Sequence, residues 1–445
     1  MIQGTSYQLR RVMGLPHATA MVVGTIIGAS IFVQPSEISR LVHSVPAVLG
    51  AWLVAGILTL FGSLVCAELA SMFSVSGGVY LYLKEAYSPA IGFLWGWAMF
   101  WVMHSGIIAA VAVVFARYVS YFIPLSLYSI KMVGVLVILL LSLVNYLGVK
   151  QGSSLQALLT LGKVVAIALL ILVGFLVGSS LPEHFMVARP LDTPNAIGGF
   201  LLAVAAGLFA FGGWHMVTYN SEETLHPRRT IPRALVLGTS IVLACYIAMN
   251  AVYLYVLPLE QVSSSPRIAA DLADALMGSG GGSVMASLVI FSTFGALSGI
   301  ILAGPRVYLA MARDGLLFDW LGQIHARYRT PHKGIVLQAG WSSLLVWTDT
   351  YRTLFSRVVY TEWIFFGLMT IGLFLLRRRS DLSRGYSVWG YPLVPAVFIV
   401  ASFVIAGRQI VADPVDSLMG LSLVAVGLPT YYLWTRKPRN RGGAQ

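Results

Sequence analysis

Long apolar runs, separated by short polar segments, fill almost the whole of this 445-residue sequence. A helix needs about 20 predominantly apolar residues to cross the hydrocarbon core of a bilayer, and most of the runs reach that length. The ninth run is short, and its end from Trp341 to Thr350 is more polar than the rest. The runs predict twelve membrane spans, at 16–40, 46–73, 90–123, 129–147, 154–178, 196–222, 231–257, 283–312, 335–349, 354–376, 393–411 and 416–434.

The composition agrees with lipid as the solvent for most of the chain. Hydrophobic residues make up 58% of the sequence and charged residues only 10%, whereas a typical soluble domain is about a quarter charged. The two cysteines, Cys66 and Cys245, both lie inside apolar runs, so no disulfide framework is expected. We therefore expect an all-α membrane protein with a single transmembrane domain over residues 1–445.

The charged residues lie mainly in the segments between the apolar runs. The formal net charge of +12 would suit a nucleic acid, but this placement is typical of membrane orientation signals. Twelve spans put both termini on one side, which carries most of the basic residues. The positive-inside rule then predicts a multi-pass protein of the cell membrane with cytoplasmic termini and no nucleic-acid partner. The basic residues on the opposite side are Arg40, Lys131, Arg189, Arg267, Arg352, Arg357 and Arg408.

Two glycine clusters interrupt spans that are five apart in the order of the chain. One runs from Gly24 to Ser30 in the first span, and the other from Gly207 to Gly213 in the sixth. Matched interruptions are typical of two inverted repeats of five spans each, here about 16–178 and 196–376, followed by two extra helices at about 393–434. Close packing of helices at glycine is the alternative interpretation of either cluster alone.

A broken span frees backbone groups, which must line a cavity in the protein because they cannot face lipid. A half-helix that starts near Ala29 offers unpaired N–H groups and a positive dipole end, which suit a carboxylate. Carbonyl groups freed near Ile26, Phe209 and Gly212 suit an ammonium group. A site with both features fits a zwitterionic amino acid.

Lys163 is a charged residue well inside the fifth span. It lies nine residues past the start of that span, or about 14 Å of helix rise, where a charge is costly and marks a functional site by default. The partners that we expect are the freed carbonyls of the first span and polar groups of the eighth, such as Ser298. The alternative is a structural ammonium that ties two helices together.

Other polar residues within the spans give weaker signals. Glu68 is expected to cap or pair near the end of span two, and Arg117 and Arg306 to snorkel or pair with loops. His104 and His215 could titrate, although a lone histidine inside a membrane span is more often a helix contact. The sequence has no phosphate loop, no metal-ligand spacing and no nucleophile elbow, so we expect neither an enzyme nor a cofactor.

At these positions the chain resembles the amino acid–polyamine–organocation superfamily, and within it most of all the L-type amino acid transporters. The likeness covers almost the whole chain. It is carried by the motifs Val23–Phe32, Ala67–Leu69, Ser76–Glu85, Phe209–Trp214, Glu222–Glu223, Pro227–Pro232 and Arg313–Gly315, together with Arg306.

This resemblance implies a LeuT-like fold that works by alternating access. It implies that the substrate carboxylate meets the N–H groups of Ala29 and Ser30, that the amine meets the carbonyls named above, and that Phe209 is the outer gate. Lys163 would take the place of a sodium ion found in related transporters, and sodium-independent exchange would follow. The implied substrate-binding residues are Ile26, Gly28, Ala29, Ser30, Phe209, Ala210, Gly212 and Trp214, with Lys163 and Ser298 in a coupling or structural role.

Three departures from the family pattern bear on this interpretation. Ser30 replaces a glycine, and His215 stands where an asparagine is common, so the substrate identity stays open. The loop at 121–130 lacks the cysteine that joins animal members to a heavy chain, so no such partner is expected. We expect a sodium-independent exchanger of neutral L-amino acids; the alternatives are a proton-coupled symporter that uses Lys163 or His215, and a membrane sensor that only binds.

Overall fold

The computed structural model describes residues 9, 11–28, 30–178, 196–278, 280–348 and 351–435. Nearly all of this part of the chain is helical, and its only strand-like contact is an isolated bridge between Met13 and Thr224. The prediction of an all-α fold is confirmed. Eleven helical stretches are long and apolar enough to cross a membrane, and α16, with 17 residues, brings the total to the expected number of about twelve.

Several predicted spans consist of more than one helical element. The first is built from α1, η1 and α2, the sixth from α10 and η3, and the eighth from α14 and α15. In chain order the elements are α1 (Leu15–Ile26), η1 (Ser30–Phe32), α2 (Gln34–Leu41), α3 (Val45–Met72), α4 (Val79–Ala86), α5 (Pro89–Ala98), η2 (Met99–Met103), α6 (His104–Val119), α7 (Leu127–Leu147), α8 (Val149–Val177), α10 (Ala196–Ala210), η3 (Trp214–Glu223), α11 (Pro227–Val256), α12 (Leu259–Ser264), α13 (Ile268–Met277), α14 (Gly281–Ala303), α15 (Pro305–Arg313), η4 (Asp319–Gly322), α16 (His332–Thr348), α17 (Tyr351–Leu376), α18 (Leu393–Ala412), α19 (Pro414–Ala425) and α20 (Gly427–Thr435).

Local sequence signals fix where several spans begin. Ser44, Ser88 and Ser126 each precede the first helix of a span, and each side chain accepts a hydrogen bond from a backbone N–H in the first turn. Serine is a favoured residue at this position because its hydroxyl pairs with a donor that the helix cannot satisfy. The outer surfaces of α7 and α8 are covered with exposed leucines, which suit contact with lipid.

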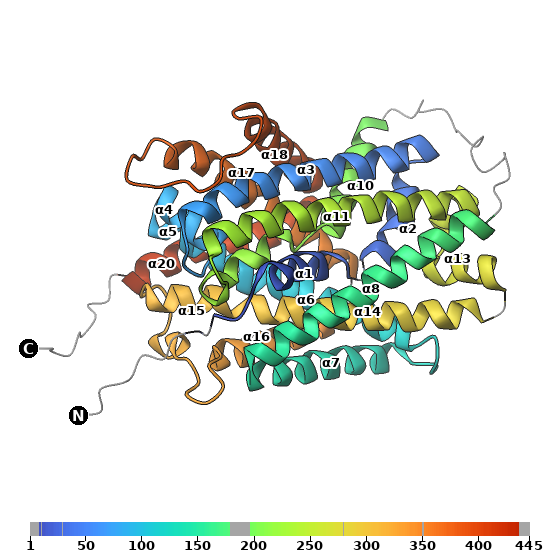
Figure 1. Cartoon of the computed structure of the whole chain (residues 1–445), viewed down its shortest axis with the longest axis horizontal. Helices are drawn as coiled ribbons and strands as arrows, with labels where there is room; N and C mark the ends of the chain where they lie inside the picture. Colours follow the sequence, from blue (N-terminus) through green and yellow to red (C-terminus); the bar gives the residue numbers. More distant parts are fainter. Residues whose placement is uncertain are drawn as a thin grey trace, which may run out of the picture.

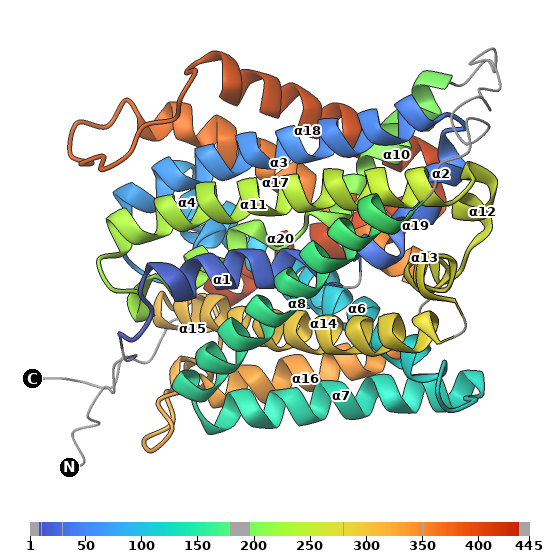
Figure 2. The same cartoon turned by 45° about the vertical axis from the view of Figure 1, so that its right-hand side comes forward.

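The helix α1 lies inside the bundle. Figures 1 and 2 show it between α11 on one side and α8 and α14 on the other, and it contacts all three. The element η3 also contacts α1, α11 and α14, so the second half of the broken sixth span packs against the first half of the broken first span. The two broken spans therefore meet inside the bundle.

The structure differs from the predicted set of spans in two places. The segment at 258–282, which lies between the predicted seventh and eighth spans, contains the short helices α12 and α13. In α13, Ile268, Ala269, Leu272 and Ala273 are buried on one side, so their helical spacing outweighs the serines and glycines at the ends of the segment. The ninth span begins three residues earlier than predicted, at His332.

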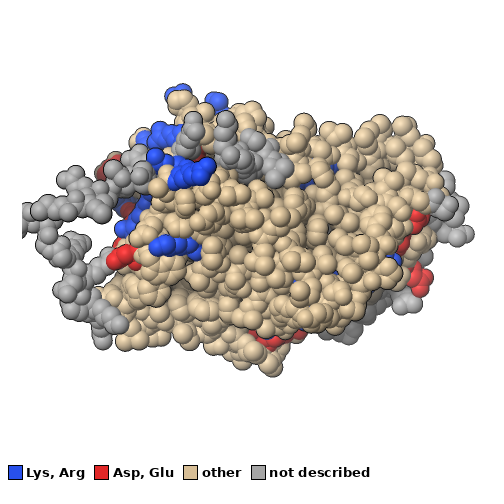
Figure 3. All heavy atoms as spheres, turned by 90° about the horizontal axis from the view of Figure 1, so that it is seen from below, with Lys and Arg blue, Asp and Glu red and all other residues tan. Residues whose placement is uncertain are grey.

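Basic side chains gather toward one end of the molecule. On the face drawn in Figure 3, Lys and Arg crowd toward the left-hand end, which is the end at which α20 finishes in Figure 1. At that end Arg313 closes α15, and Lys84 pairs with Asp314 directly after it at 2.8 Å. The sequence predicts that basic residues gather on one side of the membrane, and the structure does gather them at one end of the bundle.

Candidate functional site

The first span breaks where its glycine cluster lies. The helix α1 ends at Ile26, and Ile27 has an extended backbone with φ −71° and ψ 91°. Gly28 lies tightly against α14, since a Cβ there would be 3.1 Å from the Cβ of Ala296. The chain resumes as η1 at Ser30, whereas Ala29, an expected carboxylate ligand, lies outside the described residues.

The sixth span breaks at its own cluster. The helix α10 ends at Ala210, and Gly213 adopts a left-handed φ of 99° before η3 begins. A side chain at this position would be strained, and its Cβ would lie 3.2 Å from the carbonyl oxygen of Thr25. Within the break, the N–H of Gly212 donates to the carbonyl of Phe209 at 2.9 Å, so this carbonyl, expected to be free, already accepts one bond.

The two breaks touch each other. The Thr25 hydroxyl lies 3.2 Å from the carbonyl oxygen of Gly213, besides its closer contacts with its own helix. Tyr246 of α11 lies across both breaks, with its hydroxyl 2.9 Å from the carbonyl oxygen of Ile26 and 3.2 Å from that of Ala210. A hydroxyl has one hydrogen to donate, so it serves one of these carbonyls at a time.

Tyr246 was not among the candidate site residues predicted from the sequence. Its ring is held by Trp52 and Phe211, at centroid distances of 5.6 and 4.9 Å, so the hydroxyl position is well defined. A tyrosine in an apolar span looks like packing, and no local motif marks it. Only the pairing of α11 with both broken spans reveals its place.

Lys163 of α8 reaches the end of α1. Its ammonium donates to the carbonyls of Gly24 and Ile27 at 2.8 and 2.6 Å, and the side chain is fully buried. The expected contact with carbonyls of the first span is therefore made. The expected contact with Ser298 is not, because that hydroxyl has no hydrogen-bond partner among the described residues.

Five of the candidate ligands have buried side chains. Ile26, Ala210 and Trp214 are at most 2% exposed, and Ser30 and Phe209 are 8% and 7% exposed. The structure brings Ile26 and Ala210 together, since the Tyr246 hydroxyl contacts the carbonyls of both, and α10 also contacts η1.

The two histidines differ in their surroundings. His104 pairs through Nε2 with the carbonyl of Ile300 at 2.8 Å, which confirms that it is a helix contact. His215 lies among the rings of Trp95, Tyr219 and Phe366, and its Nδ1 has no partner in the described part of the chain. A role for His215 remains a hypothesis.

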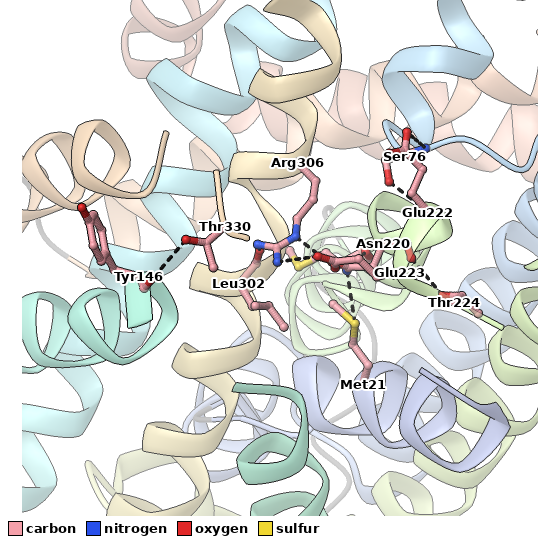
Figure 4. Close-up of polar contacts among 11 residues, drawn as sticks. Met21, Ser76, Tyr146, Asn220, Glu222, Glu223, Thr224, Leu302, Arg306 and Thr330 are labelled. Atoms are coloured by element: carbon pink, nitrogen blue, oxygen red, sulfur yellow. Dashed lines mark hydrogen bonds and ion pairs between the residues drawn. The ribbon is translucent and has the colours of Figure 1, made fainter. Parts of the chain in front are cut away.

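Arg306 and Glu223 form a buried ion pair, drawn in Figure 4. Arg306 donates from Nε and Nη2 to the Glu223 carboxylate at 3.3 and 3.1 Å, and both side chains are fully buried. The expectation that Arg306 would snorkel or pair with a loop is wrong, because its side chain turns inward onto η3. The pair ties α15 to η3, and a single buried charge there would be costly.

Three further polar contacts lie near this pair in Figure 4. The Asn220 amide lies 3.3 Å from the sulfur of Met21, which joins η3 to α1. The N–H of Ser76 donates to the Glu222 carboxylate, and the N–H of Glu222 donates to the Ser76 hydroxyl, at 3.3 and 3.2 Å. Near its C-terminal end, η3 is therefore held by polar contacts to α15, to α1 and to the segment that contains Ser76.

Glu68 pairs at the same end of the molecule, as expected. Its carboxylate accepts two hydrogen bonds from Arg377, at 2.8 and 2.6 Å, and one from the N–H of Val388. It links the end of α3 to the end of α17 and is remote from the breaks in α1 and α10.

Comparison with known proteins identifies the family. Residues 13–425 match the amino acid permease family. The chain belongs to this family. Among similar proteins, the permease is 32% identical over 428 residues to the serine/threonine exchanger SteT of Bacillus subtilis, with 95% of this chain and 97% of the relative covered. It is 31% identical to Asc-type amino acid transporter 1 of Mus musculus, covering 97% and 83% of the two chains.

A third relative is large neutral amino acids transporter small subunit 2 of Homo sapiens, 30% identical over 98% of the permease and 83% of the relative. These findings confirm the resemblance stated from the sequence motifs. They also confirm the prediction of a multi-pass membrane transporter, since the family and these relatives are transporters and not enzymes.

Proposed function

We propose that this permease is a secondary active transporter that exchanges neutral L-amino acids across the cell membrane without sodium. The observation that carries the proposal is the junction of two broken spans, held by Tyr246 from one side and Lys163 from another. Such a junction offers backbone donors and acceptors in a closed interior, which is what a zwitterion needs.

In this proposal the substrate carboxylate meets the N–H groups of Ala29 and Ser30, where η1 begins. The amine meets the carbonyls of Ile26, Phe209 and Gly212. Two of these carbonyls already accept a bond, from Tyr246 and from Gly212. This does not block the substrate, because a carbonyl oxygen has two lone pairs and can accept a second donor.

Lys163 supports independence from sodium. Its ammonium lies between two carbonyls at the end of a half-helix, which is the kind of place where a sodium ion would be coordinated. A fixed positive charge there removes the need for a mobile one. Phe209, buried beside the site, is proposed as the gate toward the outside.

Alternating access is proposed to involve two inverted repeats, at about 16–178 and 196–376, with the basic end of the molecule in the cytoplasm. Opening toward the cytoplasm must then separate η3 from α15, which the Arg306–Glu223 pair joins. We also propose that the permease works without a disulfide-linked heavy chain. Its two cysteines, Cys66 and Cys245, lie within α3 and α11.

Counterflow in proteoliposomes tests the proposal. Uptake of a radiolabelled neutral amino acid should require an unlabelled amino acid inside the vesicle, and replacement of sodium by choline should leave it unchanged. A proton-coupled symporter would instead take up substrate into empty vesicles and acidify their interior. A sensor would bind the substrate without any flux.

A further inference from the structure

An apolar groove lies on the membrane-facing side of the bundle, away from the broken spans. It has a volume of about 640 Å³ and is formed by α5, η2, α15, the segment around η4 and α16. Its walls include four tryptophans: Trp97, Trp101, Trp320 and Trp341. The indole N–H groups of Trp97 and Trp341 are bonded to backbone carbonyls, so these rings present apolar surface to the groove.

One helix face runs along the whole groove and ends in a cation. Val336, Leu337, Gly340, Trp341 and Leu344 line it from α16. Lys333 precedes them on the same face, because its spacing of 4, 7, 8 and 11 residues from the last four is the spacing of one helical side. Its ammonium lies 5.9 Å from the centre of the Trp320 ring, so the cation caps the end of the groove.

The length of this face matches one leaflet of a bilayer. Eleven residues separate Lys333 from Leu344 in α16, or about 16 Å of helix rise. Half of the hydrocarbon thickness is about 15 Å. A molecule with its charged group at Lys333 and its apolar part along the groove therefore extends from the membrane surface to the middle of the bilayer.

The net charge of the segment beside the groove favours an anion. This segment, from 317 to 333, contains three basic residues, Arg327, Arg329 and Lys333, and one acidic residue, Asp319. Lys333 makes one hydrogen bond, to Gln323 at 2.6 Å, and has no acidic partner among the described residues. Since an ammonium has three donors, two remain for a ligand.

We propose that this groove is a binding site for an anionic phospholipid of the leaflet at the basic end of the protein. One acyl chain lies along the tryptophans, and the phosphate of the headgroup meets Lys333. Basic pockets between membrane helices are suited to acidic headgroups. The proposal does not depend on the transported substrate.

The tryptophans provide the test. The full-length permease is placed in nanodiscs that contain increasing fractions of phosphatidylglycerol with brominated acyl chains, or of phosphatidylcholine with the same chains, and tryptophan quenching is recorded. Quenching by the anionic lipid should be half-maximal at an about five-fold lower mole fraction. Lys333→Gln should abolish that preference while quenching at high mole fractions persists.

Glycine positions supply a blocking variant and its control. A Cβ at Gly340 in the groove, or at Gly407 on α18, would have nothing within 4 Å, so neither position is crowded. Gly340→Phe should lower the tryptophan quenching by both lipids, because the added ring fills the groove. Gly407→Phe should leave this quenching unchanged. Equal quenching by the two lipids in the unmodified protein would show ordinary boundary lipid and overturn the proposal. So would a Gly340→Phe variant that keeps the full preference for phosphatidylglycerol.

Discussion

At the scale of single residues, Lys163 has the most constrained surroundings of the proposed site. Lys163→Ala would leave the carbonyls of Gly24 and Ile27 buried without this donor, which costs about 1–3 kcal/mol. We expect protein that still folds into the membrane but has almost no exchange activity, measured by counterflow.

Lys131 offers a matched control for that variant. Its ammonium also donates to a backbone carbonyl, that of Trp347, at 2.7 Å, but near the start of α7 and the end of α16 and remote from the breaks. Lys131→Ala should keep most of the exchange activity. Normal exchange by a well-expressed Lys163→Ala protein would rule out a role for this lysine in transport.

Ser30 is the residue that we expect to limit substrate size. It begins η1, and its CH₂OH group stands where a glycine would leave room beside the substrate carboxylate. We expect the permease to prefer small or medium neutral amino acids, and Ser30→Gly to shift the preference toward larger side chains. A competition series from glycine to tryptophan measures this. An unchanged ranking in the variant, or a native preference for tryptophan, would contradict it.

At the scale of elements, Tyr246 connects α11 to both broken spans. Tyr246→Phe removes the hydroxyl but keeps the ring between Trp52 and Phe211, so the loss is that of a hydrogen bond, about 0.5–1.5 kcal/mol. We expect a folded protein with slower exchange. Tyr253→Phe on the same helix is the control, because the buried Tyr253 hydroxyl has no partner among the described residues. Equal exchange rates in the two variants would contradict the prediction.

Both broken spans could be predicted from the sequence because their cause is local. Glycines weaken a helix wherever they lie, and the breaks follow Ile26 and Ala210, close to the predicted positions. The partners of the freed groups could not be predicted in the same way. Tyr246 is 220 residues from Ile26, and no property of a tyrosine in an apolar run indicates which way its hydroxyl points.

The same reason explains the error at Arg306. Near the end of a span, an arginine reaches water by extending along the helix, and this is the usual outcome. Here Glu223, 83 residues earlier, provides a buried carboxylate instead. Sequence motifs marked both residues separately, but their pairing depends on how η3 packs against α15.

At the scale of the whole molecule, the ion pairs at the basic end should differ in how much each stabilises the folded protein. Glu223→Gln would leave Arg306 buried without a counter-charge, which typically costs 3–5 kcal/mol. We expect a clear fall in Tm, measured by tryptophan fluorescence in detergent.

The neighbouring pair gives the comparison. Glu222 binds Arg313 at 3.0 Å, with the two side chains 26% and 36% exposed, so Glu222→Gln should cost only about 0–1 kcal/mol. A Tm for Glu223→Gln that is as high as that for Glu222→Gln would show that burial of the first pair does not stabilise the fold.

The contact between Lys163 and α1 also has a consequence for movement. The carbonyls of Gly24 and Ile27 belong to the last turn and the C-cap of α1, so the ammonium is a cap supplied by another helix at the negative end of the helix dipole. A helix of 12 residues is marginal on its own. If α1 tilts away from α8, its C-terminal carbonyls lose the contact with the Lys163 ammonium, and another cation is needed to stabilise them. The ammonium group of a bound amino acid, which we propose meets the carbonyl of Ile26, would be such a cation. A loaded site would then make the tilt easier than an empty one, so that α1 moves mainly when substrate is present, as obligatory exchange requires.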